Sequence, residues 1–241
     1  MAFVLAAVAV VSLTVFFATG ASRQRSARVA QAGGSPLLSV PLLEYGVWMT
    51  RPFVQLATSL HISPDVLSWA SLFFHFGAAF ELALGRADWA VLWLILGGAC
   101  DMLDGAVARA RGVASDAGEV LDAVVDRWAE MAVLFGLAYW YRDFTIGFGL
   151  ALWAAAGSLM VSYTRAKSQA MGVAAPGGWM QRHERAAFLV IAVFLSALLT
   201  RFAPVFANWP ILAALGLIAA LSTVASMQRT QALRAALRDR Q

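Results

Sequence analysis

The sequence predicts an all-α integral membrane protein: a six-helix transmembrane bundle core plus an N-terminal extra transmembrane helix and an interfacial helix. Apolar residues make up 61% of the 241 residues and charged residues 13%, whereas a soluble domain is about 45–50% apolar and about 25% charged. The mean hydropathy is +0.70. Seven apolar stretches are also near the roughly 20 residues that a helix needs to cross a bilayer core.

The apolar stretches divide the chain into four parts, and they cover residues 3–19, 64–84, 88–108, 119–141, 145–167, 184–200 and 207–227. Residues 1–36 are the first stretch with a basic linker. We expect a retained anchor there, since no basic residues precede the apolar run, as they do in a signal peptide. Residues 37–62 mix aromatic and charged side chains, which predicts an interfacial helix interrupted by Pro52. Residues 63–228 form the predicted six-helix domain, and 229–241 a basic cytoplasmic tail.

Basic residues predict the orientation of the chain. Arginine and lysine concentrate after the first and third stretches, around the loop between the fifth and sixth, and in the tail. Such loops stay in the cytoplasm, so we expect a multi-pass protein of the inner (cytoplasmic) membrane with its N-terminus outside. The net charge of +4 then follows from topology and attraction to the lipid bilayer, and no nucleic-acid partner is expected. The single cysteine, Cys100, excludes an internal disulfide.

Four aspartates interrupt the apolar pattern near the predicted cytoplasmic surface. Asp101 and Asp104 are three residues apart at the end of the third stretch, and Asp122 and Asp126 are four apart on the next. Both spacings place carboxylates on one helical face. The short hinge at 109–118 returns the chain, so we expect all four acids in one pocket. Four carboxylates at a membrane interface repel one another unless cations bind.

The residue types around these acids indicate a diphosphate site. Oxygen ligands suit hard divalent ions, Mg²⁺ or Mn²⁺, and two ions about 4 Å apart can clamp a diphosphate. Gly105 and Ala108 leave room for a nucleotide to approach the helix, and Arg109 offers a planar donor fork for phosphate.

These residues resemble a known signature. The pattern D-x2-D-G-x2-A-R-x8-G-x3-D-x3-D of the CDP-alcohol phosphotransferases is matched at all of its positions, which are Asp101, Asp104, Gly105, Ala108, Arg109, Gly118, Asp122 and Asp126. The resemblance implies transfer of a phosphatidyl group from CDP-diacylglycerol to a polar alcohol, with release of CMP, by a metal-dependent enzyme that forms a homodimer.

The resemblance also implies roles for single residues. The four aspartates would hold two metal ions, and Asp126 would also be the general base. The cytidine diphosphate would be bound by Asp101, Gly105, Ala108, Arg109, Gly118 and Asp122. Upstream, Asp65 and Ser68 replace the family's Asn and Thr, so we expect Ser68 to turn inward rather than to bind nucleotide.

The acceptor is predicted from a second group of residues. SYTRAK and QRHER resemble the phosphatidylinositol-phosphate synthases, which implies that Ser162, Arg165, Arg182 and Arg185 bind a phosphorylated inositol. Ordinary membrane topology also accounts for basic residues here, and glycerol 3-phosphate or another alcohol stays an alternative acceptor.

Two further classes of function fit the sequence less well. Acids in a multi-span protein can mark the path of an ion-coupled transporter, but these cluster at one interface and no internal repeat is present. A noncatalytic scaffold would have no use for four repelling carboxylates. Glu130 either orients a metal ligand or makes a hydrogen bond within the bundle, and Asp116 is expected to cap a helix that begins near Gly118.

Overall fold

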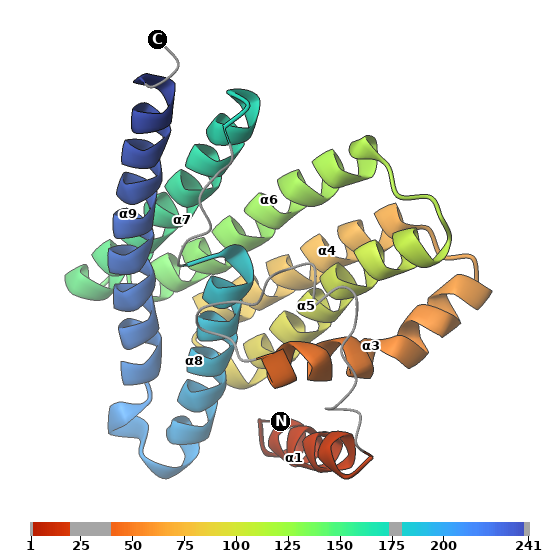
Figure 1. The fold of residues 1–241 in the computed structure, drawn as a ribbon. Coiled ribbons are helices and arrows are strands. Elements are labelled where there is room, and N and C mark those ends of the chain that lie inside the picture. The colour runs from red at the N-terminus through yellow and green to blue at the C-terminus, as the bar shows by residue number, and fades with distance from the viewer. Residues whose placement is uncertain (1, 20–39, 174–179, 239–241) are drawn as a thin grey trace.

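The computed structural model describes residues 2–19, 40–173 and 180–238, and all regular secondary structure in these ranges is helical (Figure 1). The predicted linker lies outside the described residues. The elements are α1 (Ala2–Ala18), α3 (Val40–Ser59), α4 (Pro64–Ala83), α5 (Ala87–Ala110), α6 (Asp116–Trp140), α7 (Thr145–Ala170), α8 (Arg182–Phe202), the 3₁₀ turn η2 (Pro204–Phe206) and α9 (Trp209–Arg238). Residues 229–238 of the predicted tail continue α9 as one helix.

Five of the described helices are long and apolar enough to cross a membrane: α4, α5, α7, α8 and the segment Pro204–Arg238 that contains α9. The remaining predicted core span, α6, is 25 residues long, but its first half carries the charged residues of the site. The protein is thus an integral multi-pass membrane protein. Large apolar side chains such as Phe73, Trp128 and Ile146 face outward, as suits a surface in lipid.

Helix α1 has 17 residues and packs against α3, α5 and α8. Phe16 is fully buried and contacts the rings of Tyr45 and Trp48 on α3. In Figure 1, α1 lies at a steep angle to α8 and α9. Its role as a membrane-spanning anchor stays a prediction.

The expectation that Pro52 interrupts the interfacial helix is wrong. Helix α3 runs through Pro52 for 20 residues, although Figure 1 shows its two halves running at an angle. A proline inside a helix removes one backbone donor and strains one turn, yet the helix continues past it. Ala57 on α3 packs in a small core with Leu67 and Val107.

Side-chain caps set where the site helices begin. Ser115 has extended backbone angles and accepts a hydrogen bond from the Gly118 N–H at 3.2 Å. It is therefore the cap of α6, and the expectation that Asp116 is the cap was wrong by one residue. Helix α8 begins with a capping box in which the Gln181 N–H donates to Glu184 at 2.9 Å.

The main apolar core lies at the end of the bundle away from the acids. It joins the first half of α5 and the second half of α6 to α4, α7, α8 and α9. Close backbone packing supports it: a Cβ on Gly136 of α6 would lie 2.4 Å from the carbonyl oxygen of Ala79 on α4. A Cβ added to Gly97 of α5 would likewise lie 2.5 Å from the ring of His75 on α4. This glycine therefore allows the two helices to pack closely.

Candidate metal and substrate site

Three of the four motif aspartates form one group. Asp101 on α5 and Asp122 and Asp126 on α6 each offer a carboxylate oxygen, and these oxygens lie within 4.8 Å of one another. Asp126 is buried, with 6% of its surface exposed. The hinge between α5 and α6 brings the two helix ends together, as the spacing predicted.

Asp104 lies outside this three-acid group and faces the neighbouring cavity. Its carboxylate accepts a hydrogen bond from the Ser68 hydroxyl at 2.7 Å and one from the Gly105 N–H at 2.5 Å. Ser68 is buried on α4, which agrees with the expectation that it turns inward. The hydroxyl thereby holds one motif carboxylate in place from a second helix.

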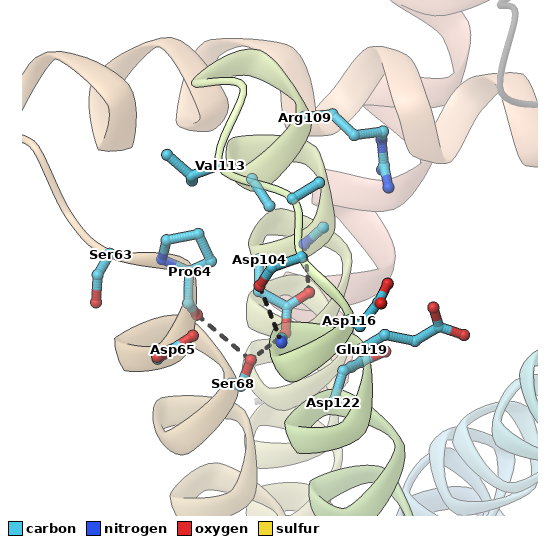
Figure 2. Close-up of a pocket in the computed structure, with 15 residues that line it drawn as sticks. Ser63, Pro64, Asp65, Ser68, Asp104, Arg109, Val113, Asp116, Glu119 and Asp122 are labelled. Atoms are coloured by element: carbon cyan, nitrogen blue, oxygen red, sulfur yellow. Dashed lines mark hydrogen bonds between the residues drawn. The ribbon is translucent and has the colours of Figure 1, made fainter.

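A cavity of about 650 Å³ opens beside Asp104. Figure 2 shows Ser68 and Asp104 on one wall, Glu119 and Asp122 on another, and Arg109 above them. Five of the six residues predicted to bind cytidine diphosphate line this cavity: Gly105, Ala108, Arg109, Gly118 and Asp122. Asp101 does not line it. Its α4 wall is held near α5 by Arg111, which donates to the Ile62 carbonyl at 3.0 Å.

A second cavity, of about 770 Å³, lies on the other side of α6. Ser162 and Arg165 of α7 line it, together with Asp126. Glu119 and Asp122 line both cavities. The acidic residues therefore stand between two spaces, one bounded by the motif and the other by two of the predicted acceptor residues.

Arg182 is turned toward the acids. Its guanidinium donates to both carboxylate oxygens of Asp101, at 3.2 and 2.8 Å, and lies 2.5 Å from an oxygen of Asp126 in an ion pair. The bidentate contact joins α8 to α5, and the ion pair with Asp126 joins α8 to α6. Arg182 thus lies against the predicted metal ligands and is not a lining residue of the second cavity.

Arg185, three residues further along α8, is buried in an ion pair with Glu130. Its Nε donates to Glu130 at 2.6 Å and its Nη2 at 2.9 Å, while Nη1 donates to the Met180 carbonyl at 2.5 Å. Only 1% of Arg185 is exposed, and it lines neither large cavity. Of the two roles left open for Glu130, the hydrogen bond within the bundle is the one observed.

Sequence reasoning missed this pairing, although a signal was present. Asp126 and Glu130 are four residues apart on α6, and Arg182 and Arg185 are three apart on α8, so each pair occupies one helical face. Two acids on one helix and two arginines on another, each pair about one turn apart, predict ion pairs between α6 and α8. Arg229 was also missed: it is buried and donates to the Val161 carbonyl at 3.2 Å, next to Ser162.

The residues present fit divalent ions. Three carboxylate oxygens within reach of one centre are the ligands that Mg²⁺ and Mn²⁺ prefer. Among the described residues, one guanidinium, that of Arg182, forms ion pairs with acids of this group, which leaves an excess of negative charge, and buried like charges are costly without a counter-ion. Asp122 belongs to the three-acid group and also lines the cavity with the motif glycines, so ions held there would adjoin a bound diphosphate.

A multi-pass helical protein that gathers hard-cation ligands between two cavities has the composition of a membrane enzyme that uses a metal ion. The chain belongs to the CDP-alcohol phosphatidyltransferase family, whose model matches residues 61–225.

Its relatives and structural neighbours agree with this assignment. The phosphatidylinositol phosphate synthase of Mycolicibacterium smegmatis is 32% identical over 197 residues, which is 78% of this chain and 85% of that protein. The archaetidylinositol phosphate synthase of Pyrococcus horikoshii is 34% identical over 145 residues, or 58% of this chain and 73% of that protein.

Solved structures of the phosphatidylinositol phosphate synthase of Mycobacterium tuberculosis share the fold at 27% identity. The structure with CDP-DAG bound has a TM-score of 0.66 and covers 76% of this chain and 92% of its own. The complex with manganese and citrate has a TM-score of 0.67 and covers 76% and 88%.

Proposed function

We propose that this protein transfers the phosphatidyl group of CDP-diacylglycerol to an inositol phosphate and releases CMP. The observation that supports it most directly is the position of the acids between two cavities that share Asp122 and Glu119. A two-substrate transfer needs both partners to reach one phosphorus atom, and adjoining cavities on either side of the acids provide that.

The donor would occupy the cavity bounded by the motif. Gly105 and Ala108 present little side chain there, and Arg109 and Gly118 line the same space. A guanidinium matches phosphate oxygens with two parallel hydrogen bonds. Ser68 keeps the Asp104 carboxylate turned toward this cavity, so the donor meets a wall whose shape is set before it binds.

The acceptor would occupy the second cavity, where Ser162 and Arg165 supply a hydroxyl and a positive charge for a phosphorylated alcohol. Arg127 lines the same cavity, and its Nη1, which lies 3.8 Å from an oxygen of Glu130, is buried without a hydrogen-bond partner. A phosphate dianion would satisfy this donor. Arg182 and Arg185 do not line this cavity, and acceptor binding by them remains our proposal from the family resemblance.

In the reaction, a hydroxyl oxygen of the acceptor bonds to the β-phosphorus of the donor while the bond from that phosphorus to the CMP oxygen breaks. Asp126 lines the acceptor cavity and would take the hydroxyl proton. CMP departs with the electron pair of the broken bond. Two divalent ions, held by Asp101, Asp122 and Asp126 with Asp104, would neutralise diphosphate charge and polarise the phosphorus.

The donor carries a lipid tail and a water-soluble head, so a site at a helix end near the membrane surface suits it. We propose that this surface is cytoplasmic, because the basic loops lie on that side. We also propose a homodimer, as the family resemblance implies; cross-linking in native membranes would test it.

The direct test is turnover by purified protein with CDP-diacylglycerol, Mg²⁺ or Mn²⁺ and a panel of acceptors, read as CMP release. We expect product with inositol phosphate and none when the metal is chelated. Turnover with glycerol 3-phosphate alone would replace the acceptor and leave the reaction class unchanged. CMP release with no acceptor dependence would contradict the transfer reaction.

A further inference from the structure

Arg182 is a cation of the protein that lies within the acidic group. It is the first residue of α8, and its guanidinium contacts both oxygens of Asp101 and one oxygen of Asp126. These acids come from α5 and α6, so one side chain links three helices at the site.

The same two carboxylates belong to the three-acid group in which we propose that divalent ions bind. The shortest guanidinium contacts are 2.8 Å to Asp101 and 2.5 Å to Asp126. An ion drawn to these oxygens would meet the guanidinium at short range. Like charges repel strongly in partly buried surroundings, so bound ions and Arg182 in its observed position would compete for the same oxygens.

The surroundings allow this side chain to move without its helix. The Arg182 side chain is 28% exposed, whereas that of Arg185, one turn further, is 1% exposed. The start of α8 is held separately, by the capping box of Gln181 with Glu184 and by the pairing of Arg185 with Glu130. Release of Arg182 from the acids therefore leaves the N-terminus of α8 anchored.

We propose that Arg182 is an exchangeable counter-ion of the acidic group: it neutralises Asp101 and Asp126 when no divalent ion is bound, and it leaves both carboxylates when ions enter. The proposal rests on the metal site of the proposed function. It explains how acids that need cations can coexist in the metal-free protein, and it makes metal affinity depend on a residue that is not a ligand.

The test compares wild type with Arg182→Gln, as purified protein in detergent freed of metal by a chelator. Mn²⁺ binding is followed by electron paramagnetic resonance. We expect Arg182→Gln to bind Mn²⁺ about tenfold tighter or more, because a competing positive charge is removed. In the presence of chelator, Arg182→Gln should unfold at a lower temperature than wild type. Saturating Mn²⁺ should reduce this difference in unfolding temperature.

Arg165→Gln is the matched control. It removes the same charge from the adjoining cavity, and among the described residues Arg165 takes part in none of the ion pairs. We expect its Mn²⁺ affinity to stay within about threefold of wild type, because exposed charges are screened by solvent. A tenfold gain in Arg165→Gln as well would overturn the specific role of Arg182.

Equal Mn²⁺ affinity and equal metal-free stability in wild type and Arg182→Gln would overturn the inference while leaving the metal site intact. A wild type that binds no Mn²⁺ would contradict the metal site itself. If Arg182→Gln fails to fold, Arg182→Lys keeps the charge but loses the bidentate contact. It should fold and bind Mn²⁺ more tightly than wild type, and unchanged or weaker binding would count against the exchange.

Discussion

The buried pair of Glu130 and Arg185 should be essential to the stability of this end of the bundle. In Glu130→Gln the side chain keeps its size but turns one carboxylate oxygen into an amide NH₂, which cannot accept a hydrogen bond from the guanidinium. The observed contacts are 2.6 and 2.9 Å, and the two side chains are 1% and 8% exposed. Arg185 would keep its full charge in a buried position with the Met180 carbonyl and one amide oxygen as acceptors.

The expected cost follows from this burial. Removing one partner of a buried ion pair costs about 3–5 kcal/mol, and the oxygen that glutamine retains favours the lower end, about 3 kcal/mol. In a protein of this size, each kcal/mol lowers the unfolding temperature by about 2–4 °C. Glu130→Gln should therefore unfold roughly 6–12 °C below wild type.

Thermal unfolding of the purified protein in one detergent measures this, with Arg127→Gln as the control. Arg127 lies 3.8 Å from Glu130 and its side chain is 32% exposed, so its loss should cost less than about 1 kcal/mol. Adding Arg185→Met to Glu130→Gln removes the stranded charge and should restore part of the stability. Equal effects of Glu130→Gln and Arg127→Gln, or no rescue by the double substitution, would refute the argument.

Three other changes have defined outcomes. Asp126→Asn removes the proton acceptor and should reduce turnover by at least about a hundredfold, with the KM for the donor nearly unchanged in steady-state assays of CMP release. Gly136→Ala places a Cβ 2.4 Å from the Ala79 carbonyl oxygen and should cost about 1–3 kcal/mol in thermal unfolding as α4 and α6 separate. Ser68→Ala removes the 2.7 Å hydrogen bond to buried Asp104 and should cost about 1–3 kcal/mol, with a higher KM for the donor.

Near-normal turnover of Asp126→Asn would remove that residue as the base. Gly149→Ala is the control for the helix-packing prediction, because a Cβ there meets nothing within 4 Å. It should leave stability unchanged or raise it, since alanine favours helices over glycine. A donor KM of wild-type size in Ser68→Ala would mean that Asp104 keeps its position without the hydroxyl.

Much of the fold could be read from local patterns. Apolar runs of about the thickness of a bilayer predicted each core helix, and the observed bounds lie within a few residues of the expected ones except at the end of α9, which continues to Arg238. The errors were local too. Ser115, not Asp116, caps α6. Serine and aspartate are both common caps, so the sequence could not decide between these neighbours, whereas the backbone angles do. Helix α3 continues through Pro52, where the proline predicted an interruption.

The acidic motif was predictable for a similar reason. Asp101, Asp122 and Asp126 lie within 26 residues of one another, on two helices joined by a short hinge, so helical periodicity and one turn suffice to bring them together. Such local geometry is largely independent of the rest of the protein. Even so, Asp104 is held apart from the three by Ser68, and no spacing along the chain indicated that.

The sequence by itself determined the membrane environment, the helices and the cation-binding chemistry, since these follow from composition and from the spacing of residues close together in the chain. Only the tertiary structure decided the partners that come from far along the chain. Arg182 is 81 residues from Asp101, and Arg185 is 55 from Glu130. Which arginine meets the acids and which is buried in an ion pair depends on how α8 rotates and packs against α5 and α6, and that is set by the whole core.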